Sequence, residues 1–425
     1  MRDSQVEPRP QENPSKAPSE EAGSGLAVVP TNLPRVVLCS SELAKRGLCE
    51  LAENLSAVQK LPDMPVGLWG HAAISDEANE RVLIVGGWQN ASTWAFSLRD
   101  WRWQELCPAG CSEGLLYPAV ALDTHRNRLI SFGGWKERVR PAIDDLMVLS
   151  LQPGSSSQWQ RITAKGRWPN ARCGASLTVD ADGKRAFLFG GDTGGETRRM
   201  ELRADLWCLD LEALTWHLLR HGGEPWLTRR FHQAHSHAVR GRLVIFGGEA
   251  GRSRWHDDGG GGSVAVVASV VPGQRHWFAP KGHLRPGVAM GYVEEANAIV
   301  GVSGRVNMGS PASESPCVWR YDLGEFRTWR SPLQSGVEVG PVQDHATCYC
   351  RHRRSLFWAG GKPHRSMRAS EGRTGAFLVN LDALKLGCPD NPESCSDRFG
   401  AMEWRSRKPE RSVAARNGVD GPDRP

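Results

Sequence analysis

An apolar, strand-like run that stops at two adjacent glycines recurs through most of this 425-residue chain. The glycine pairs are Gly86 and Gly87, Gly133 and Gly134, Gly190 and Gly191, Gly247 and Gly248, and Gly360 and Gly361. A degenerate copy has Ser303 followed by Gly304. Successive copies are 47, 57, 57, 56 and 57 residues apart. A fixed period of this length is typical of a repeat architecture, so the chain must repeat one structural unit.

Each repeat contains more than the glycine phrase. A second apolar run follows the glycines, as in TWAFSL, LMVLSL, LWCLDL and VWRYDL, and a tryptophan comes after it. These tryptophans are Trp103, Trp159, Trp216, Trp277 and Trp329. Another run precedes the glycines and opens at His71, His232 or His345. Each unit is therefore predicted to hold four short strands separated by turn-rich loops.

The glycines have a physical reason in such a unit. Four-stranded sheets arranged around an axis pack most tightly near the centre, where paired glycines permit a tight turn and close backbone approach. The tryptophan of the outer strand would be buried between neighbouring sheets. Because one sheet cannot bury both of its faces alone, the units must close into a ring. We predict an all-β, six-bladed propeller of four-stranded antiparallel blades.

The glycine phrase, Asp205-Leu206-Trp207 and the spaced Trp216 resemble Kelch repeats, over roughly residues 55–385. The resemblance implies a Kelch-type, galactose oxidase-like β-propeller. It implies little about activity, because Kelch propellers serve many unrelated tasks.

Ring closure requires a strand from outside the six units. Residues 54–61 are in phase for an outermost strand, and we favour closure by this segment. The competing closure uses a C-terminal strand near Trp404, and a degenerate seventh blade from residues 27–53 is a further alternative.

The remaining segments predict the domain boundaries. Residues 1–38 are predicted to be a disordered polar tail, and residues 39–53 a short helix that follows a serine cap. The propeller is expected over residues 54–385. Residues 386–425 form a C-terminal extension that is predicted to be largely disordered.

Composition restricts the location and the partners. Eleven cysteines are scattered through the chain, and no secretory signal is visible, so we expect reduced thiols and a cytoplasmic or nuclear location. The longest apolar run is far too short to cross a bilayer. The net charge of +6 is modest and no RNA-binding motif is present. We therefore expect a protein partner and neither nucleic acid nor membrane.

Tryptophan and arginine gather in the loops that follow the glycine pairs or join successive units. In antiparallel blades these loops share one face, and both residue types are enriched at interface hot spots. The candidate partner-binding residues are Trp88, Trp135, Arg138, Trp168, Arg172, Trp226, Arg230, Trp255 and Arg285. For Trp88 and Trp135 the alternative is packing against neighbouring loops. For Arg172, Arg230 and Arg285 it is a structural pair with a buried carbonyl or carboxylate.

Catalysis has weaker support. His235 and His237 share one face of a strand whereas His232 points the other way, which disfavours a three-histidine metal site. Galactose oxidase needs a copper site built with tyrosines, and no such set is evident. Plant specifier proteins use a Glu-x3-Asp-x3-His motif, but Leu209 replaces its histidine after Glu201 and Asp205.

We therefore expect a non-catalytic scaffold without metal or cofactor that binds a protein, such as an extended acidic segment, through the Trp/Arg-lined face. The alternative is a specifier-like or oxidase-like metalloenzyme.

Overall fold

The protein is described here from a computed structural model. The described residues are 58–88, 90–107, 114–136, 142–155, 158–193, 201–220, 228–237, 241–250, 266–269, 277–278, 289–303, 317–323, 327–332, 342–343, 345–363 and 375–381. The chain divides into two compact units, 1–52 and 53–425, and every described residue lies in the second. The two expected tails and the helix expected over 39–53 lie outside the described residues.

The secondary structure of the described residues consists of strands and one 3-10 turn, Glu77–Asn79. No helix in this part of the chain has the length and apolar composition needed to span a bilayer.

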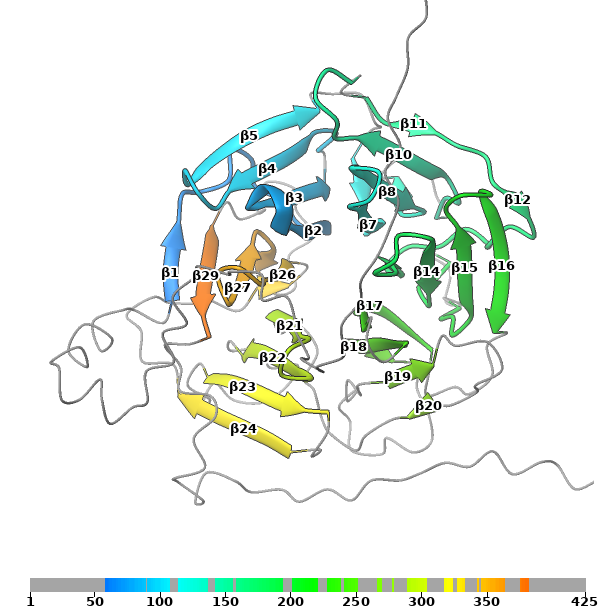
Figure 1. Ribbon diagram of the computed structural model, residues 1–425. Coiled ribbons are helices and arrows are strands. Elements are labelled where there is room, and N and C mark those ends of the chain that lie inside the picture. The colour runs from blue at the N-terminus through cyan, green and yellow to red at the C-terminus, as the bar shows by residue number, and fades with distance from the viewer. Residues whose placement is uncertain are drawn as a thin grey trace, which may run out of the picture. The chain divides into compact units, whose positions relative to one another are not determined.

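Six sheets of four or more strands, called sheets I to VI, follow one another along the chain (Figure 1). Sheet I holds β2 (His71–Asp76), β3 (Arg81–Gly86), β4 (Thr93–Ser97) and β5 (Arg102–Cys107); sheet II holds β7 (Ala119–Asp123), β8 (Arg128–Phe132), β10 (Leu146–Ser150) and β11 (Gln160–Arg161); sheet III holds β13 (Ser176–Val179), β14 (Arg185–Phe189), β15 (Leu206–Asp210), β16 (Thr215–Arg220) and β12 (Lys165–Gly166). Sheet IV holds β17 (Arg229–His237), β18 (Arg242–Ala250), β19 (Val266–Ser269) and β20 (Trp277–Phe278); sheet V holds β21 (Ala289–Val293), β22 (Ala298–Ser303), β23 (Cys317–Asp322) and β24 (Arg327–Pro332); sheet VI holds β26 (Ala346–Cys350), β27 (Ser355–Ala359), β29 (Ala376–Asn380) and β1 (Val58–Leu61). Two short pairs, β6 (Leu115–Leu116) with β9 (Trp135–Lys136) and β25 (Val342–Gln343) with β28 (Lys362–Pro363), complete the strands.

The sheets form a propeller. The first strand of each sheet lies nearest the axis: β2 contacts β7, β7 contacts β13, β13 contacts β17, β21 contacts β26, and β26 contacts β2. Sheets IV and V share a core in which Val244 and Phe246 pack with Met290 and Tyr292. The predicted all-β propeller is therefore confirmed.

Sheet III departs from the expected four strands. The segment that leaves sheet II forms β12, which pairs in parallel with β16 on the outer edge of sheet III. This fifth strand covers an edge that would otherwise expose unpaired backbone groups.

The N-terminal strand supplies the closure that the sequence favoured. β1 pairs antiparallel with β29, with Val58 opposite Val379 and Leu61 opposite Ala376. The indole Nε1 of Trp103 in sheet I donates to the carbonyl of Pro62 over 2.9 Å, immediately after β1. Closure by a C-terminal strand, the competing prediction, is not what the described residues show.

The paired glycines join neighbouring sheets. In four sheets the second glycine donates its N–H to a carbonyl of the next sheet in the ring: Gly87 to Leu115 at 2.8 Å, Gly134 to Arg172 at 2.8 Å, Gly191 to Arg229 at 2.8 Å, and Gly361 to Leu68 at 2.7 Å. The first glycine lies against the same carbonyl. A Cβ on Gly133 would lie 2.3 Å from the Arg172 oxygen, and its φ of +68° is one that other residues rarely adopt. Both glycines of the phrase are therefore required by close contact between sheets.

The repeat tryptophans pack between sheets where their side chains are described. Trp159 is buried and its Nε1 donates to Thr93 Oγ1 of sheet I over 3.0 Å. Trp216 is buried with its ring 5.4 Å from Phe132 of sheet II. Trp277 and Trp329 lie in β20 and β24, in phase with the others.

Two repeat histidines are buried near the axis. Burial lowers the pKa of both His71 and His232 to about 3. His232 Nε2 lies 2.8 Å from Ser176 Oγ of the neighbouring sheet. Both imidazoles are thus neutral parts of the contacts between sheets.

We predict that replacing Gly133 with alanine destabilises the protein far more than replacing Gly154. Gly154 also has a positive φ, +77°, but an added Cβ there would contact nothing within 4 Å. Gly154→Ala should therefore cost only the backbone strain, about 1–2 kcal/mol. Gly133→Ala must in addition push sheet III away from sheet II. Urea unfolding of the two variants measures the difference, and equal losses would refute the close-contact explanation.

We also predict that acid destabilises the fold through the buried histidines. Their pKa is lowered from 6.5 in the unfolded chain to about 3 in the folded one, so the unfolded state binds more protons between these values. Stability is complete above about pH 6.5 and falls as the pH decreases, by about 1.4 kcal/mol per pH unit for each histidine.

His232→Gln should reduce this slope by about 1.4 kcal/mol per pH unit, measured by urea unfolding from about pH 7.5 to about pH 5. His217→Gln, on an exposed position of β16, is the matched control and should leave the slope unchanged. An unaltered slope in His232→Gln would contradict the assignment.

Candidate functional site

A series of backbone hydrogen bonds crosses four sheets near the axis. Tyr117 N–H donates to the Gly70 carbonyl (2.7 Å), Gly174 N–H to Tyr117 (3.0 Å), and Phe231 N–H to Gly174 (2.8 Å). These residues lie at or just before the innermost strands of sheets I to IV. All four have positive φ, 69°, 51°, 63° and 57° in chain order.

Two members of this series are aromatic residues in a backbone region that favours glycine. Holding Tyr117 and Phe231 there costs on the order of 1–3 kcal/mol each, and such strain persists only where the surrounding structure imposes it. Strained residues of this kind are concentrated at ligand clamps and other functional sites. The observation makes this end of the axis the first candidate for a binding site.

The side chains at this position form what we call the axial aromatic series: Trp88, Trp69, Tyr117 and Phe231. Trp88 stacks on Trp69 with ring centroids 4.8 Å apart and planes 15° apart. Trp69 lies 6.4 Å from Tyr117, and Tyr117 lies 4.6 Å from Phe231. Trp69 is buried, whereas the other three rings are partly exposed. The series brings rings from sheets I, II and IV together on one surface.

Arg230 extends this series but its charge is already paired. Its guanidinium lies 4.7 Å from the Phe231 ring centroid. Nε donates to Glu249 Oε2 over 2.9 Å and Nη1 donates to Asp192 Oδ2 over 3.1 Å. Two carboxylates therefore offset its positive charge.

Arg172 is a structural residue. It is fully buried, forms a bidentate pair with Asp205 at 2.7 and 2.9 Å, and donates to the Gly190 carbonyl over 2.9 Å. Burial raises the pKa of Asp205, but the hydrogen bonds and charge of Arg172 lower it further, so the carboxyl stays below its ordinary value. The Arg172 side chain has no exposed surface, and its contacts are those of the structural pair that the sequence offered as the alternative. The partner-binding role of Arg172 stays a prediction.

The sequence reasoning missed the equivalent arginine one repeat later. Arg229, 57 residues after Arg172, is buried and its Nη1 lies 3.4 Å from the Gly247 carbonyl. Burial lowers its pKa to about 10. Arg230 was taken for the repeat arginine, although the 57-residue step identifies Arg229.

The two other described tryptophan candidates are Trp168 and Trp135. Trp168 Nε1 donates to the Asp144 carbonyl over 3.1 Å, and its ring packs edge-on against Trp216 at 6.5 Å. Trp135 is half-buried in β9, opposite Leu116 of β6. Trp168 therefore packs against neighbouring elements, and its role in partner binding stays a prediction.

Four candidates and one repeat glycine lie outside the described residues. These are Arg138, Trp226, Trp255, Arg285 and Gly304.

The histidine-rich strand β17 divides as its alternation predicts. His232 faces sheet III, whereas His235 and His237 face Glu294 of sheet V at 3.7 and 3.3 Å. Across the described ranges, no group of three or more His, Cys, Asp or Glu side chains is arranged to hold a metal ion.

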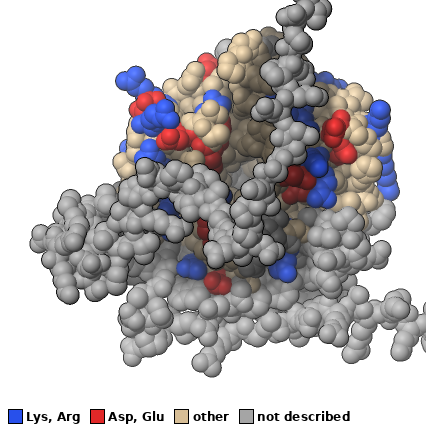
Figure 2. Space-filling model, in the orientation of Figure 1, with Lys and Arg blue, Asp and Glu red and all other residues tan. Residues whose placement is uncertain are grey.

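Charges on the face seen in Figure 2 are mixed. Lys and Arg alternate with Asp and Glu over the described surface rather than forming a patch of one sign. Opposite charges also pair in the described part of the chain, as Arg161 does with Asp145 at 2.8 Å.

Comparison with known proteins agrees with the repeat geometry. The family model for the KLHDC2/KLHL20/DRC7 Kelch-repeats domain matches residues 119–259. Acyl-CoA-binding domain-containing protein 5 of Arabidopsis thaliana is 34% identical over 195 residues, covering 42% of this chain and 27% of that protein. Host cell factor 2 of Homo sapiens is 27% identical over 207 residues, covering 44% of this chain and 25% of that protein. The matched region is thus about a quarter of the length of these relatives.

Among solved structures, that of YjhT superimposes with a TM-score of 0.55 and 14% sequence identity, over 74% of this chain and 95% of that one. At this identity the likeness concerns the fold alone. The family match, the glycine phrases and their contacts between sheets agree: residues 119–259 match a Kelch-repeats domain, and the described sheets repeat the same unit in a β-propeller.

Proposed function

We propose that this protein is a non-catalytic scaffold that binds another protein through the face bearing the axial aromatic series. The observation that carries the proposal is a set of partly exposed rings, Trp88, Tyr117 and Phe231, in which buried Trp69 links Trp88 to Tyr117 and Tyr117 packs on Phe231. Tryptophan and tyrosine dominate the binding energy of many interfaces. Kelch propellers support many functions, so the fold alone is not the argument.

The rings are held in place before any partner arrives. Tyr117 and Phe231 are fixed by backbone hydrogen bonds of 2.7 and 2.8 Å to neighbouring sheets, and Trp88 is stacked on buried Trp69. Binding to preorganised side chains avoids part of the entropic cost of ordering them. This favours a partner segment that places apolar or aromatic side chains on the series.

The arginines contribute less than the sequence suggested. Arg172 is buried and Arg230 is paired with two carboxylates. The described cations therefore give little support to selection of an acidic segment, and we assign the main anchoring role to the aromatic rings.

Two finer features belong to the same proposal. We infer that the platform is a closed ring of six blades, supported by the six sheets and the Gly361-to-Leu68 hydrogen bond between sheets VI and I. A cytoplasmic or nuclear location is supported by four described cysteines that are free thiols: Cys173, Cys208, Cys348 and Cys350.

We predict that Tyr117→Asn together with Phe231→Asn abolishes partner capture without unfolding the domain. Asparagine tolerates the positive φ at both positions, so the substitutions remove the rings and keep the backbone. The measurement is a pull-down from native lysate with quantitative mass spectrometry. Specific partners should fall by about tenfold or more, as expected for hot-spot residues.

The matched control is Leu219→Ala, which removes a large apolar side chain that is 48% exposed on the outer strand β16. Partners should be retained by this variant. Equal capture by wild type, control and double variant would place the binding site elsewhere. A stoichiometric, tightly held transition metal in the purified protein would contradict the non-catalytic assignment.

A further inference from the structure

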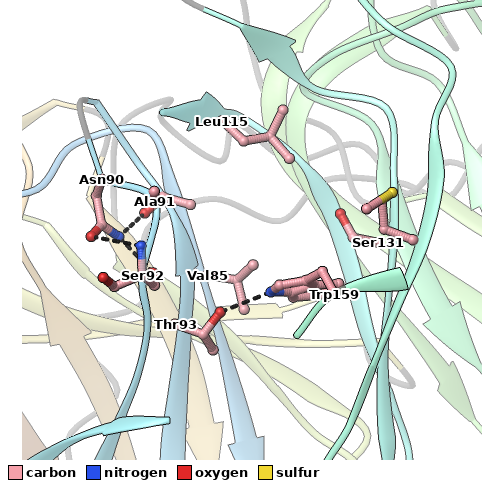
Figure 3. A pocket seen from close by; sticks show the side chains of 10 residues that line it. Val85, Asn90, Ala91, Ser92, Thr93, Leu115, Ser131 and Trp159 are labelled. Atoms are coloured by element: carbon pink, nitrogen blue, oxygen red, sulfur yellow. Dashed lines mark hydrogen bonds between the residues drawn. The ribbon is translucent and has the colours of Figure 1, made fainter. Parts of the chain in front are cut away.

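A small cavity lies between sheets I and II, away from the axial aromatic series. Its volume is about 30 Å³, and Val85, Thr93, Leu115, Ser131, Met147 and Trp159 are among the residues that line it. Figure 3 shows Thr93 of sheet I on one side and Trp159 and Ser131 of sheet II on the other, around the same space. A water molecule needs roughly 10–15 Å³ of such space, so one or two would fit.

The cavity follows from a small residue at one position of the repeat. Ser131 lies two residues before the first glycine of its phrase. The equivalent residues of four other sheets are Ile84, Leu188, Ile245 and Trp358, and that of sheet V is Gly301. A serine side chain in place of the four larger ones leaves part of the space between the sheets unfilled.

The serine hydroxyl is buried without a partner. Ser131 is 2% exposed, and its Oγ forms no hydrogen bond with any described residue. Buried polar groups in folded proteins almost always bond to protein or to ordered water. The unpartnered hydroxyl therefore indicates that the cavity holds a ligand.

Thr93 supplies a second polar group from the opposite sheet. It is 1% exposed, and its Oγ1 accepts the Trp159 Nε1 hydrogen over 3.0 Å. A hydroxyl that accepts one bond still has its own hydrogen to donate. The Gly86 carbonyl, which also lines the cavity, accepts from Asn90 over 2.9 Å and retains a second lone pair.

We propose that this cavity is a binding site for an ordered water molecule that bridges Thr93 Oγ1 and Ser131 Oγ and so joins sheets I and II. The water accepts the Thr93 hydrogen and exchanges a hydrogen bond with Ser131. It completes a polar chain that begins at the Trp159 indole. Two hydroxyls and a nearby carbonyl give it the two to four partners that buried waters have.

The direct test is a high-resolution crystal structure of the full chain and of Ser131→Ile. Wild type should show a solvent peak within hydrogen-bond distance of both hydroxyls. The peak should vanish in Ser131→Ile, which carries an aliphatic side chain as three of the other sheets do. An empty cavity, or a peak that touches neither hydroxyl, overturns the proposal.

A second measurement does not depend on crystals. Ser131→Ala and Thr93→Val should each lower the melting temperature, and the double variant should lose less than their sum, because either change removes the same water. The control is Thr178→Val, at a half-buried position in sheet III, whose effect should add to that of Ser131→Ala. Additive losses for the Ser131 and Thr93 pair would overturn the proposal.

Discussion

The hydrogen bond from a glycine N–H of one sheet to a carbonyl of the next is the contact on which the rest of the structure depends. It occurs between sheets I and II, II and III, III and IV, and VI and I with donor–acceptor distances of 2.7 to 2.8 Å. The preceding glycine allows this approach, since a Cβ at Gly133 would collide with the accepting carbonyl. The separation of the sheets near the axis is thus set by backbone rather than by side chains.

The candidate site follows from the same geometry. Once the inner strands are this close, the residues that enter them bond to one another across sheets, and Tyr117 and Phe231 take up positive φ in doing so. Their rings then project into one series with Trp69 and Trp88. The proposed binding face is therefore a consequence of ring assembly, and it forms only when the sheets are in place.

Periodicity in the sequence was enough to predict the strands, the glycine contacts and closure by the segment that contains β1. It was not enough to separate structural arginines from exposed ones, because spacing along the chain does not show that Asp205 folds back onto Arg172.

The axial aromatic series did leave a signal in the sequence: Gly70, Tyr117, Gly174 and Phe231 follow the 47- and 57-residue steps of the glycines. Two aromatics at positions otherwise occupied by glycine mark a site, but only the observed φ angles reveal the strain. Ser131 likewise differs from the larger residues at this position in four other repeats, although the cavity beside it depends on packing that no one-dimensional pattern gives.

We infer that the ring behaves as one cooperative unit, closed by the contact between sheets VI and I. Native-state hydrogen exchange at the amides of Gly87, Gly134, Gly191 and Gly361 tests this most directly. We expect all four to exchange with the same free energy, that of global unfolding. The contrary result is that the Gly361 amide exchanges through a local opening of much lower free energy while the other three stay protected. In that case the closing contact would not hold the ring together and the account would be wrong.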